Sequence, residues 1–127
     1  MVPLNILHDG LVRARALIET PKRWTKGAMA RDSRRVAVAP TDEDAFAYDL
    51  LGAIFRAGYD LADIRVTNEL RDVLTRVSGG RESDRLWLIE WHDAPSRKHH
   101  DVLALIDAAL STLTEPSNEP TGSLDEI

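Results

Sequence analysis

The sequence predicts a mostly α-helical single domain of about five helices, with one small β-hairpin packed at one side. Apolar residues recur at steps of three and four along several segments, which is the period of an amphipathic helix. A chain of 127 residues suits one domain that can bury a core without disulfides or metals. We expect residues 1–113 to form this domain and residues 114–127, which are acidic and contain two prolines, to form a disordered tail.

The first two predicted elements are a helix and a hairpin. The helix covers roughly residues 4–19, and its apolar stripe is Leu4, Leu7, Leu11, Ala14 and Ile18. The hairpin pairs residues 28–31 with residues 35–38 across the polar turn "DSR". Gly27 and Pro40 would mark its two ends.

A second helix is predicted from Thr41, which would be its N-cap, to a stop at Gly58. Three acids after Thr41 would complement the positive end of the helix dipole, and Gly58 suits a left-handed stop. Its predicted buried stripe is Phe46, Leu50, Ala53, Ile54 and Ala57.

Two further helices are predicted over residues 62–77 and after Ser96. Their apolar stripes are Ile64, Leu70, Val73, Leu74 and Val77 in the former, and Val102, Leu103, Ile106, Ala109, Leu110 and Leu113 in the latter. The run "LWLIEW" (86–91) between them could be a helix or a buried strand, because periodicity does not separate the two in so short a run.

Composition excludes several classes of protein. The sequence has no cysteine, so a disulfide framework, a thiolate metal site and a cysteine nucleophile are excluded. No apolar run approaches the roughly 20 residues that a membrane span requires. The first ten residues lack the layout of a signal peptide, so we expect a soluble cytoplasmic protein that does not engage a membrane.

Charge is distributed unevenly along the chain. Residues 11–35 carry eight bases and two acids, whereas the whole chain has a net charge of −5. The basic segment could contact an anion, another protein or a second copy of the chain. We do not expect nucleic acid as a partner, because the sequence pI is about 5.3 while nucleic-acid-binding domains are usually basic.

Three stretches of the sequence contain short motifs with tryptophan, glycine and charged residues at fixed spacing. "WTKGAMARD" (24–32) is similar to a W-x-x-G-A-x-A-R-D motif, and "EWHDAPSRKHHD" (90–101) contains a version of W-N-D-x-P-x-R. "YDLLGAIFRA" (48–57) resembles a helix usually written W-C-x-x-G-A. Here Tyr48 and Asp49 replace the tryptophan and cysteine, and His92 replaces the asparagine. Together the three stretches resemble a family of small, uncharacterised bacterial and phage proteins classed as a domain of unknown function. This resemblance implies motif positions but no activity.

Several residues in these motifs could carry chemistry. A metal would need His92 and Asp93 to fold back toward His99 or His100, which are adjacent and diverge by about 100° on a helix. We therefore predict no metal site and no cofactor. The stretch 90–101 is predicted to be a junction, in which Asp93 accepts backbone N–H bonds and Ser96 caps the next helix.

Two further expectations concern buried polar groups in the motifs. If Asp49 is buried, it could act as a general acid or base, but an ion pair with Arg31 or Arg97 is the more ordinary explanation. Arg97 itself suggests a carboxylate partner, Asp93 or Glu90. Trp24 is expected in the core rather than stacked on a ligand.

Two classes of function remain. The first is a non-enzymatic binding or regulatory module that acts through protein or anion contacts, including contacts with its own copies. The alternative is a small-molecule-binding protein or an enzyme whose site lies where the Trp24, Asp49 and Asp93 motifs converge. We favour the first, because no recognisable catalytic set is present. The candidate site residues are Trp24, Arg31, Asp49, Trp91, His92, Asp93 and Arg97.

Overall fold

The structure, a computed structural model, describes residues 1–114 of the chain. Its elements in chain order are α1 (Leu4–Leu17), the 3₁₀ turn η1 (Pro21–Arg23), β1 (Ala30–Arg31), β2 (Ala37–Val38), β3 (Ala47–Tyr48), α2 (Leu50–Asp60), α3 (Ile64–Val77), α4 (Trp87–Asp93) and α5 (His99–Thr112). The predicted fold class, mostly helical with five helices and a small sheet, is confirmed. Residues 115–127, most of the predicted tail, lie outside the described residues.

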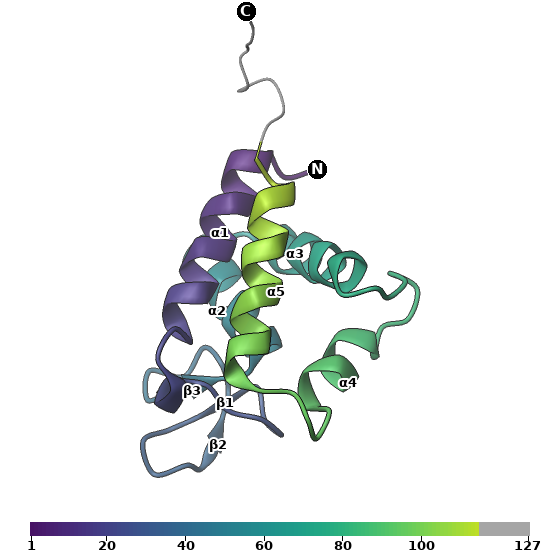
Figure 1. The fold of residues 1–127 in the computed structure, drawn as a ribbon. Helices are drawn as coiled ribbons and strands as arrows, with labels where there is room; N and C mark the ends of the chain where they lie inside the picture. The colour runs from purple at the N-terminus through teal and green to yellow at the C-terminus, as the bar shows by residue number, and fades with distance from the viewer. Residues whose placement is uncertain (115–127) are drawn as a thin grey trace, which may run out of the picture.

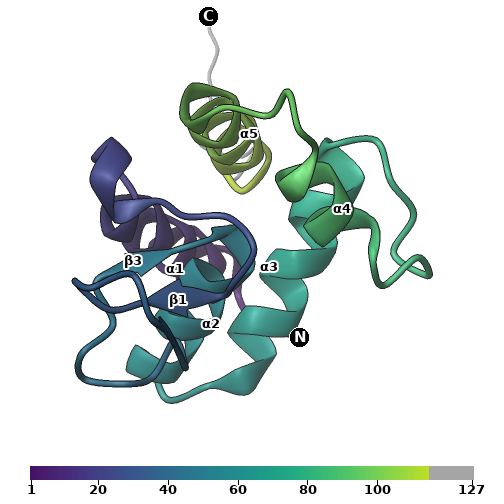
Figure 2. The same ribbon diagram turned by 90° about the horizontal axis from the view of Figure 1, so that it is seen from below.

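The helices surround one apolar core. α1 packs against α2, α3 and α5, and α2 packs closely against α3. Figure 1 shows α1 and α5 side by side, with the sheet at the end of the body away from the N-terminus. In the view from below, the sheet lies across the near end of α1 and α2, and α4 lies beside α3 (Figure 2). Over residues 1–114, no helix is long and apolar enough to cross a membrane.

The predicted first and last helices are confirmed. The helix α1 buries the predicted Leu7, Leu11, Ala14 and Ile18, while Leu4 at its start is 36% exposed. The last helix begins at His99 rather than just after Ser96, because the carboxylate of Asp101 accepts the backbone N–H of Lys98 at 2.9 Å. An acid placed three residues inside the helix thus caps α5, so the predicted Ser96 cap is wrong.

The predicted hairpin is present, but it belongs to a larger sheet. β1 pairs antiparallel with β2, so that Ala30 lies opposite Val38, as the hairpin prediction requires. β1 also pairs antiparallel with β3, which places Ala30 opposite Tyr48. The sheet order is therefore β2-β1-β3, and the third strand comes from a segment that the sequence analysis assigned to a helix.

The start of the second helix was predicted wrongly. α2 begins at Leu50, and its N-cap is Asp49, whose Oδ1 accepts the Gly52 N–H at 2.6 Å. Thr41 is not a cap. The backbone around the acids makes turns instead, with Ala45 N donating to Asp42 O at 3.0 Å. Four predicted stripe residues are fully buried, but Phe46 lies before the helix and is only partly buried.

The turn between α2 and α3 also differs from the prediction. The helix α2 continues past Gly58 to Asp60, and the left-handed residue is Ala62, with a φ of 57°. Gly58 instead allows a close approach of the two helices, because a Cβ there would lie 2.1 Å from Thr67 Oγ1. In α3, Ile64 was predicted in the buried stripe, yet it is 60% exposed. Asp63 caps α3 by accepting the backbone N–H of Arg65.

The ambiguous run 86–91 is helical. α4 spans Trp87–Asp93 and buries Leu88 and His92 against the rest of the body. The helix ends before Ala94, whose ψ of 138° is extended as expected for the residue before a proline. The stretch 90–101 is therefore the junction between α4 and α5, as predicted.

Candidate functional site

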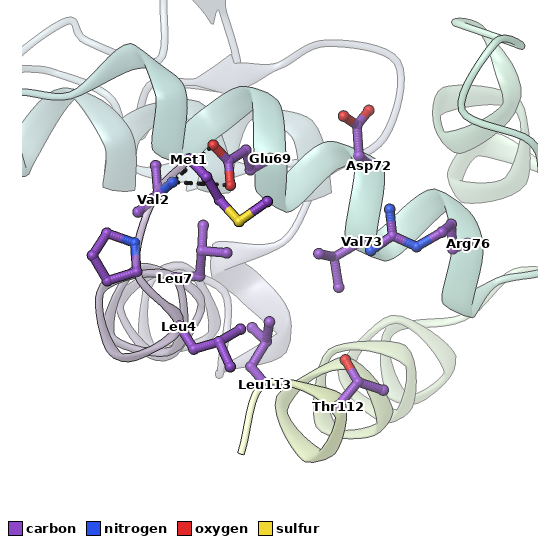
Figure 3. A pocket seen from close by; sticks show the side chains of 11 residues that line it. Met1, Val2, Leu4, Leu7, Glu69, Asp72, Val73, Arg76, Thr112 and Leu113 are labelled. Carbon is purple, nitrogen blue, oxygen red and sulfur yellow. Dashed lines mark hydrogen bonds between the residues drawn. The ribbon is translucent and has the colours of Figure 1, made fainter. Parts of the chain in front are cut away.

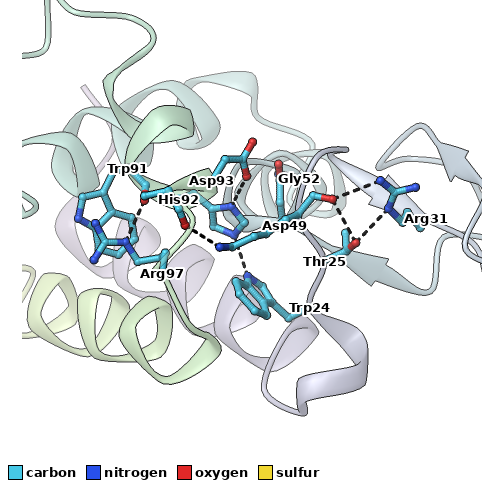
Figure 4. Close-up of polar contacts among 11 residues, drawn as sticks. Trp24, Thr25, Arg31, Asp49, Gly52, Trp91, His92, Asp93 and Arg97 are labelled. Atoms are coloured by element: carbon cyan, nitrogen blue, oxygen red, sulfur yellow. Dashed lines mark hydrogen bonds and ion pairs between the residues drawn. The ribbon is translucent and has the colours of Figure 1, made fainter.

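Three motif segments that are far apart in the sequence converge next to the sheet. The chain after η1 runs parallel to β3, with a bridge between Trp24 and Tyr48 and a 3.0 Å bond from Thr25 N to Tyr48 O. The end of α4 closes over this segment from the other side (Figure 4). The structure brings together Trp24, Asp49, His92 and Asp93, which we call the motif cluster. The other predicted site residues, Arg31, Trp91 and Arg97, lie on its two flanks (Figure 4).

His92 is the centre of the motif cluster. Its side chain is buried, and its Nε2 accepts the indole N–H of Trp24 at 2.7 Å. Because Nε2 is the acceptor, we assign the ring proton to Nδ1, which lies 2.9 Å from Asp93 Oδ1 and donates to it. Burial lowers the pKa of His92, although the Asp93 carboxylate acts in the opposite direction. His92 is thus a neutral imidazole with both nitrogens occupied by protein partners.

Asp93 does not play the predicted capping role. It is the last residue of α4, and its Oδ1 binds the imidazole of His92 rather than backbone N–H groups. The carboxylate therefore fixes the tautomer of His92, which in turn makes Nε2 available to Trp24.

Asp49 is a buried carboxyl group without an arginine partner. It is 2% exposed, and burial raises the pKa of Asp49 to about 7, while the Gly52 N–H lowers it and the Asp93 carboxylate raises it further. Within residues 1–114 it forms no ion pair, so the predicted pairing with Arg31 or Arg97 is wrong. The raised pKa favours the neutral form of Asp49, which lowers the free-energy cost of burying this carboxyl group without a cation beside it.

A close backbone contact explains why the "YDLLGAIFRA" stretch has a glycine at position 52. An added Cβ would lie only 1.8 Å from the carbonyl oxygen of Met29. The same oxygen accepts the backbone N–H of Asp49 at 3.1 Å. The first turn of α2 thus sits directly on the 24–32 segment, and only glycine permits that approach.

Arg31 holds the loop before β1 rather than a ligand. Its Nε donates to Thr25 Oγ1 at 3.0 Å, and its terminal nitrogens donate to the carbonyl oxygens of Lys26 and Arg35. Lys26 in turn donates to Ala94 O at 2.7 Å, which ties this loop to the α4–α5 junction. Both cations are therefore committed to backbone carbonyls.

Trp91 and Arg97 form a stacked pair at the other flank. The guanidinium carbon of Arg97 lies 3.8 Å from the centre of the Trp91 ring, and Nε donates to the Trp91 carbonyl at 2.9 Å. The predicted carboxylate partner, Asp93 or Glu90, is therefore wrong. A cation–π contact combined with a backbone bond folds the junction back onto α4.

The histidines of the junction do not converge. His99 Nε2 lies 2.6 Å from the carbonyl oxygen of Ile18, and its ring packs at a tilt against Trp24, with centroids 5.6 Å apart. His100 has a side chain that is 78% exposed and is paired with Asp101. Across residues 1–114 there is no group of three histidine or carboxylate side chains that could hold a metal ion.

Four hollows on the described surface are lined by residues outside the motif cluster. The largest of the four, about 590 Å³, lies between the start of α1, α3 and the end of α5 (Figure 3). Two of its charged side chains already have partners: Glu69 accepts the Val2 N–H at 3.0 Å, and Arg76 pairs with Glu82. A second, of about 370 Å³, lies in the loop from Gly79 to Trp87.

The other two hollows adjoin along the outer side of the α2–α3 hairpin. They measure about 340 Å³ and 220 Å³ and share Phe55 and Ile64. We call the combined feature the α2–α3 groove. It is lined by Met29, Leu51, Phe55, Gly58, Tyr59, Ala62, Asp63, Ile64, Thr67, Asn68, Arg71 and Arg85.

The sequence analysis missed this groove, although a signal for it exists. Leu51, Phe55 and Tyr59 recur at spacing four on α2, away from the stripe that builds the core. Tyr59 and Ile64 are 59% and 60% exposed, which is unusual for side chains of this size standing together. A second apolar stripe on one helix indicates a second surface to cover.

Comparison with known proteins places the chain in a family without assigning an activity. No curated protein and no solved structure matches the chain significantly. A family model, described as a family of unknown function (DUF6197), matches residues 7–112, which include all three motif segments. That range covers most of the chain, and it confirms the predicted membership of an uncharacterised family. The chain therefore belongs to the family of unknown function DUF6197.

Proposed function

We propose that this protein is a non-enzymatic binding module that holds a partner protein in the α2–α3 groove. The observation that carries the proposal is the pair of neighbouring large apolar side chains, Tyr59 and Ile64, which stand exposed beside partly buried Phe55. Apolar patches rimmed by polar groups are typical of protein-interaction sites. A helix pair that already packs its other side on the core offers a rigid surface for this purpose.

The hydrogen bonds among Trp24, His92 and Asp93 support a binding role over catalysis. Trp24, His92 and Asp93 satisfy one another in a linear chain of hydrogen bonds. A general base must lie within hydrogen-bond reach of the proton that it removes from a substrate, whereas the two His92 nitrogens contact only Trp24 and Asp93. We infer that these hydrogen bonds have a structural role and hold the end of α4 against the segment beside the sheet.

The charge distribution supports a protein partner over nucleic acid. Within the basic segment 11–35, Arg13 pairs with Asp9 and Arg15 pairs with Asp107. Arg31 and Lys26 donate to backbone carbonyls. Two of the eight bases are thus paired with acids outside the segment, and two more are held by the backbone, which leaves fewer cations free to contact phosphates. We also propose that the protein acts in the cytoplasm.

A second candidate, a small-molecule-binding protein or enzyme using the motif cluster, is favoured by Asp49 alone. A carboxyl group with a pKa of about 7 beside a second carboxylate is a feature of many active sites. This candidate requires a ligand to reach a side chain that is only 2% exposed. It predicts that Asp49→Asn abolishes ligand binding in a metabolite screen, whereas the groove proposal predicts no change in partner binding.

Site-specific photo-crosslinking in the native host tests the groove proposal. A photoreactive residue at Tyr59 should form an adduct with one defined protein, and the same residue at Val12, which is 44% exposed on α1, should not. The identified protein, once purified, should bind the unmodified chain and protect the groove amides from hydrogen exchange. Ile64→Glu should weaken that binding at least tenfold. Equal adducts from Tyr59 and Val12, or unchanged binding by Ile64→Glu, would contradict the proposal.

A further inference from the structure

The α2–α3 groove has the dimensions of a site for one short helix. Ile64, Thr67, Asn68 and Arg71 follow the spacing i, i+3, i+4 and i+7, so they form one face of α3. This face spans the eight residues from Ile64 to Arg71, or about two turns at 3.6 residues per turn. The facing stripe on α2 is Leu51, Phe55 and Tyr59, which rises by the same number of turns.

The two ends of the groove differ in chemistry. At the end near the α2–α3 turn, Phe55, Tyr59 and Ile64 supply apolar and aromatic surface. The only acid there, Asp63, is committed to Arg65, whose terminal nitrogen lies 2.7 Å from its carboxylate. That end therefore offers apolar contact without a free charge.

The opposite end carries two guanidinium groups. Arg71 and Arg85 line the hollow together with Asn68 and Met29. The nearest carboxylate to Arg71 is Asp72, at 4.0 Å, the outer limit of an ion pair. Arg85 forms no ion pair within residues 1–114. Guanidinium groups bind carboxylates in a bidentate geometry, so this end is complementary to an acidic side chain.

We propose that the groove takes an amphipathic helix of the partner protein, with its apolar face on Phe55, Tyr59 and Ile64 and carboxylates on Arg71 and Arg85. This inference rests on the proposed function and specifies its partner. A helix bound in an apolar groove usually contacts it with side chains at i, i+3 or i+4 and i+7. These positions span about two turns, which is the length of this groove. The arginines then set the direction of the bound helix, since only one end of it can carry the acids.

The test uses designed helical peptides and the full chain. Two fifteen-residue peptides carry the same leucine anchors and a pair of glutamates, at the N-terminal end in one and at the C-terminal end in the other. Matched peptides have lysines in place of the glutamates. Titration followed by amide chemical shifts should show one glutamate peptide binding at Phe55, Tyr59 and Ile64. Its affinity should exceed that of its lysine counterpart at least tenfold.

Charge reversal in the protein gives the decisive comparison. Arg71→Glu with Arg85→Glu should reverse the preference, so that the lysine peptide binds more tightly. The control Arg13→Glu with Arg34→Glu changes the net charge equally on remote, exposed side chains and should leave the preference unchanged. Circular dichroism verifies that both variants are folded.

Three outcomes would overturn the inference. Equal binding of glutamate and lysine peptides would show that the arginines do not select acids, while the groove could still be the crosslinked surface of the proposed function. No binding of any peptide up to millimolar concentration would exclude a helix. Self-association that is lost in Arg71→Glu with Arg85→Glu, measured by sedimentation, would identify a second copy of this chain as the occupant.

Discussion

The indole N–H of Trp24 donates to Nε2 of His92 at 2.7 Å, across 68 residues of sequence, and this bond joins the segment before β1 to the end of α4. His92 is 1% exposed, so no solvent can replace the indole if it is lost. The neutral tautomer that accepts this bond depends in turn on Asp93. The motif tryptophan is therefore tied to the fold by a specific polar bond as well as by packing.

Trp24→Phe should lower the free energy of unfolding by about 1–3 kcal/mol through the unpaired buried nitrogen, in addition to lost packing. Urea denaturation measures the change. Trp87→Phe is the matched control, because Trp87 donates to the part-buried hydroxyl of Ser78 at 3.0 Å, where water can take its place. A loss for Trp24→Phe no larger than that for Trp87→Phe would show that the bond to His92 contributes little.

Asp49→Asn should stabilise the protein increasingly as the pH rises from about 4 to about 7. The folded-state pKa of Asp49 is raised from 3.8 to about 7, so the folded state binds a proton that the unfolded state has released in this window. In the wild type, the contribution of Asp49 to the free energy of unfolding is fully present below pH 3.8 and is lost as the pH rises toward 7. At 1.36 kcal/mol per pKa unit, the full effect at pH 8 is on the order of 4 kcal/mol. Asparagine avoids the buried charge and retains the oxygen that accepts the Gly52 N–H.

The control for Asp49→Asn is Asp32→Asn, for which the opposite sign is expected. The Val36 N–H holds the pKa of Asp32 below its usual value, with Arg34 contributing in the same direction. Asp32 therefore stabilises the fold above the unfolded pKa and loses this contribution as the pH falls. Thermal denaturation from pH 4 to pH 8 should show Asp49→Asn above wild type and Asp32→Asn below it at neutral pH. A pH-independent difference for Asp49→Asn would contradict the shifted pKa.

Sequence patterns predicted the helices that have a regular apolar period. They failed at helix ends, where hydrogen bonds to caps and to the sheet determine where a helix begins. The acids after Thr41 have the appearance of a helix start, but the backbone of Phe46 donates to Arg31 O at 2.8 Å and joins the sheet. Pairing with β1 overrides the local preference of this segment for a helix. The helix α2 therefore begins only after Asp49, which caps it. Ile64 was assigned to the α3 stripe because it is apolar, but it lies six residues before Leu70, so helix geometry places it on the outer face with Thr67 and Arg71.

The sequence analysis expected the three motifs to meet, but it did not predict the hydrogen bonds between them, and that these residues form a functional site stays a prediction. The motifs brought Trp24, Asp49, His92 and Asp93 together on resemblance, and the structure places them side by side (Figure 4). No sequence rule assigns the two imidazole nitrogens to Trp24 and Asp93, because that choice depends on side-chain directions set by α4 and the sheet. The same limit applies to the arginines expected beside Asp49: Arg31 instead bonds Thr25 and Lys26, and Arg97 stacks on Trp91.

His99→Ala combined with His100→Ala should leave the metal content of the purified protein unchanged and near zero. His99 is engaged with the carbonyl oxygen of Ile18 at 2.6 Å, and His100 lies on the exposed side of α5. Two neighbouring histidines on a helix do not meet the spacing that one ion requires. Elemental analysis by mass spectrometry gives the zinc content of both proteins. Stoichiometric zinc that is lost in the double variant would make the α4–α5 junction a metal site.

Gly52→Ala should destabilise the fold by more than about 3 kcal/mol, beyond the 1–3 kcal/mol usual for overpacking. The added methyl would lie 1.8 Å from Met29 O, a backbone atom that also accepts the Asp49 N–H, so neither side can move without breaking the bond that holds the 24–32 segment against the start of α2. Gly79→Ala is the control. Its φ of 100° strains any side chain, but nothing lies within 4 Å of the added atom, so its cost should stay near 1–2 kcal/mol. Equilibrium unfolding in urea compares the two, and in Gly52→Ala the amide signal of Asp49 should also shift as its bond to Met29 breaks. If Gly52→Ala is as stable as Gly79→Ala, the close contact between α2 and the 24–32 segment is wrong, and the convergence of the motifs on this point would have to be revised with it.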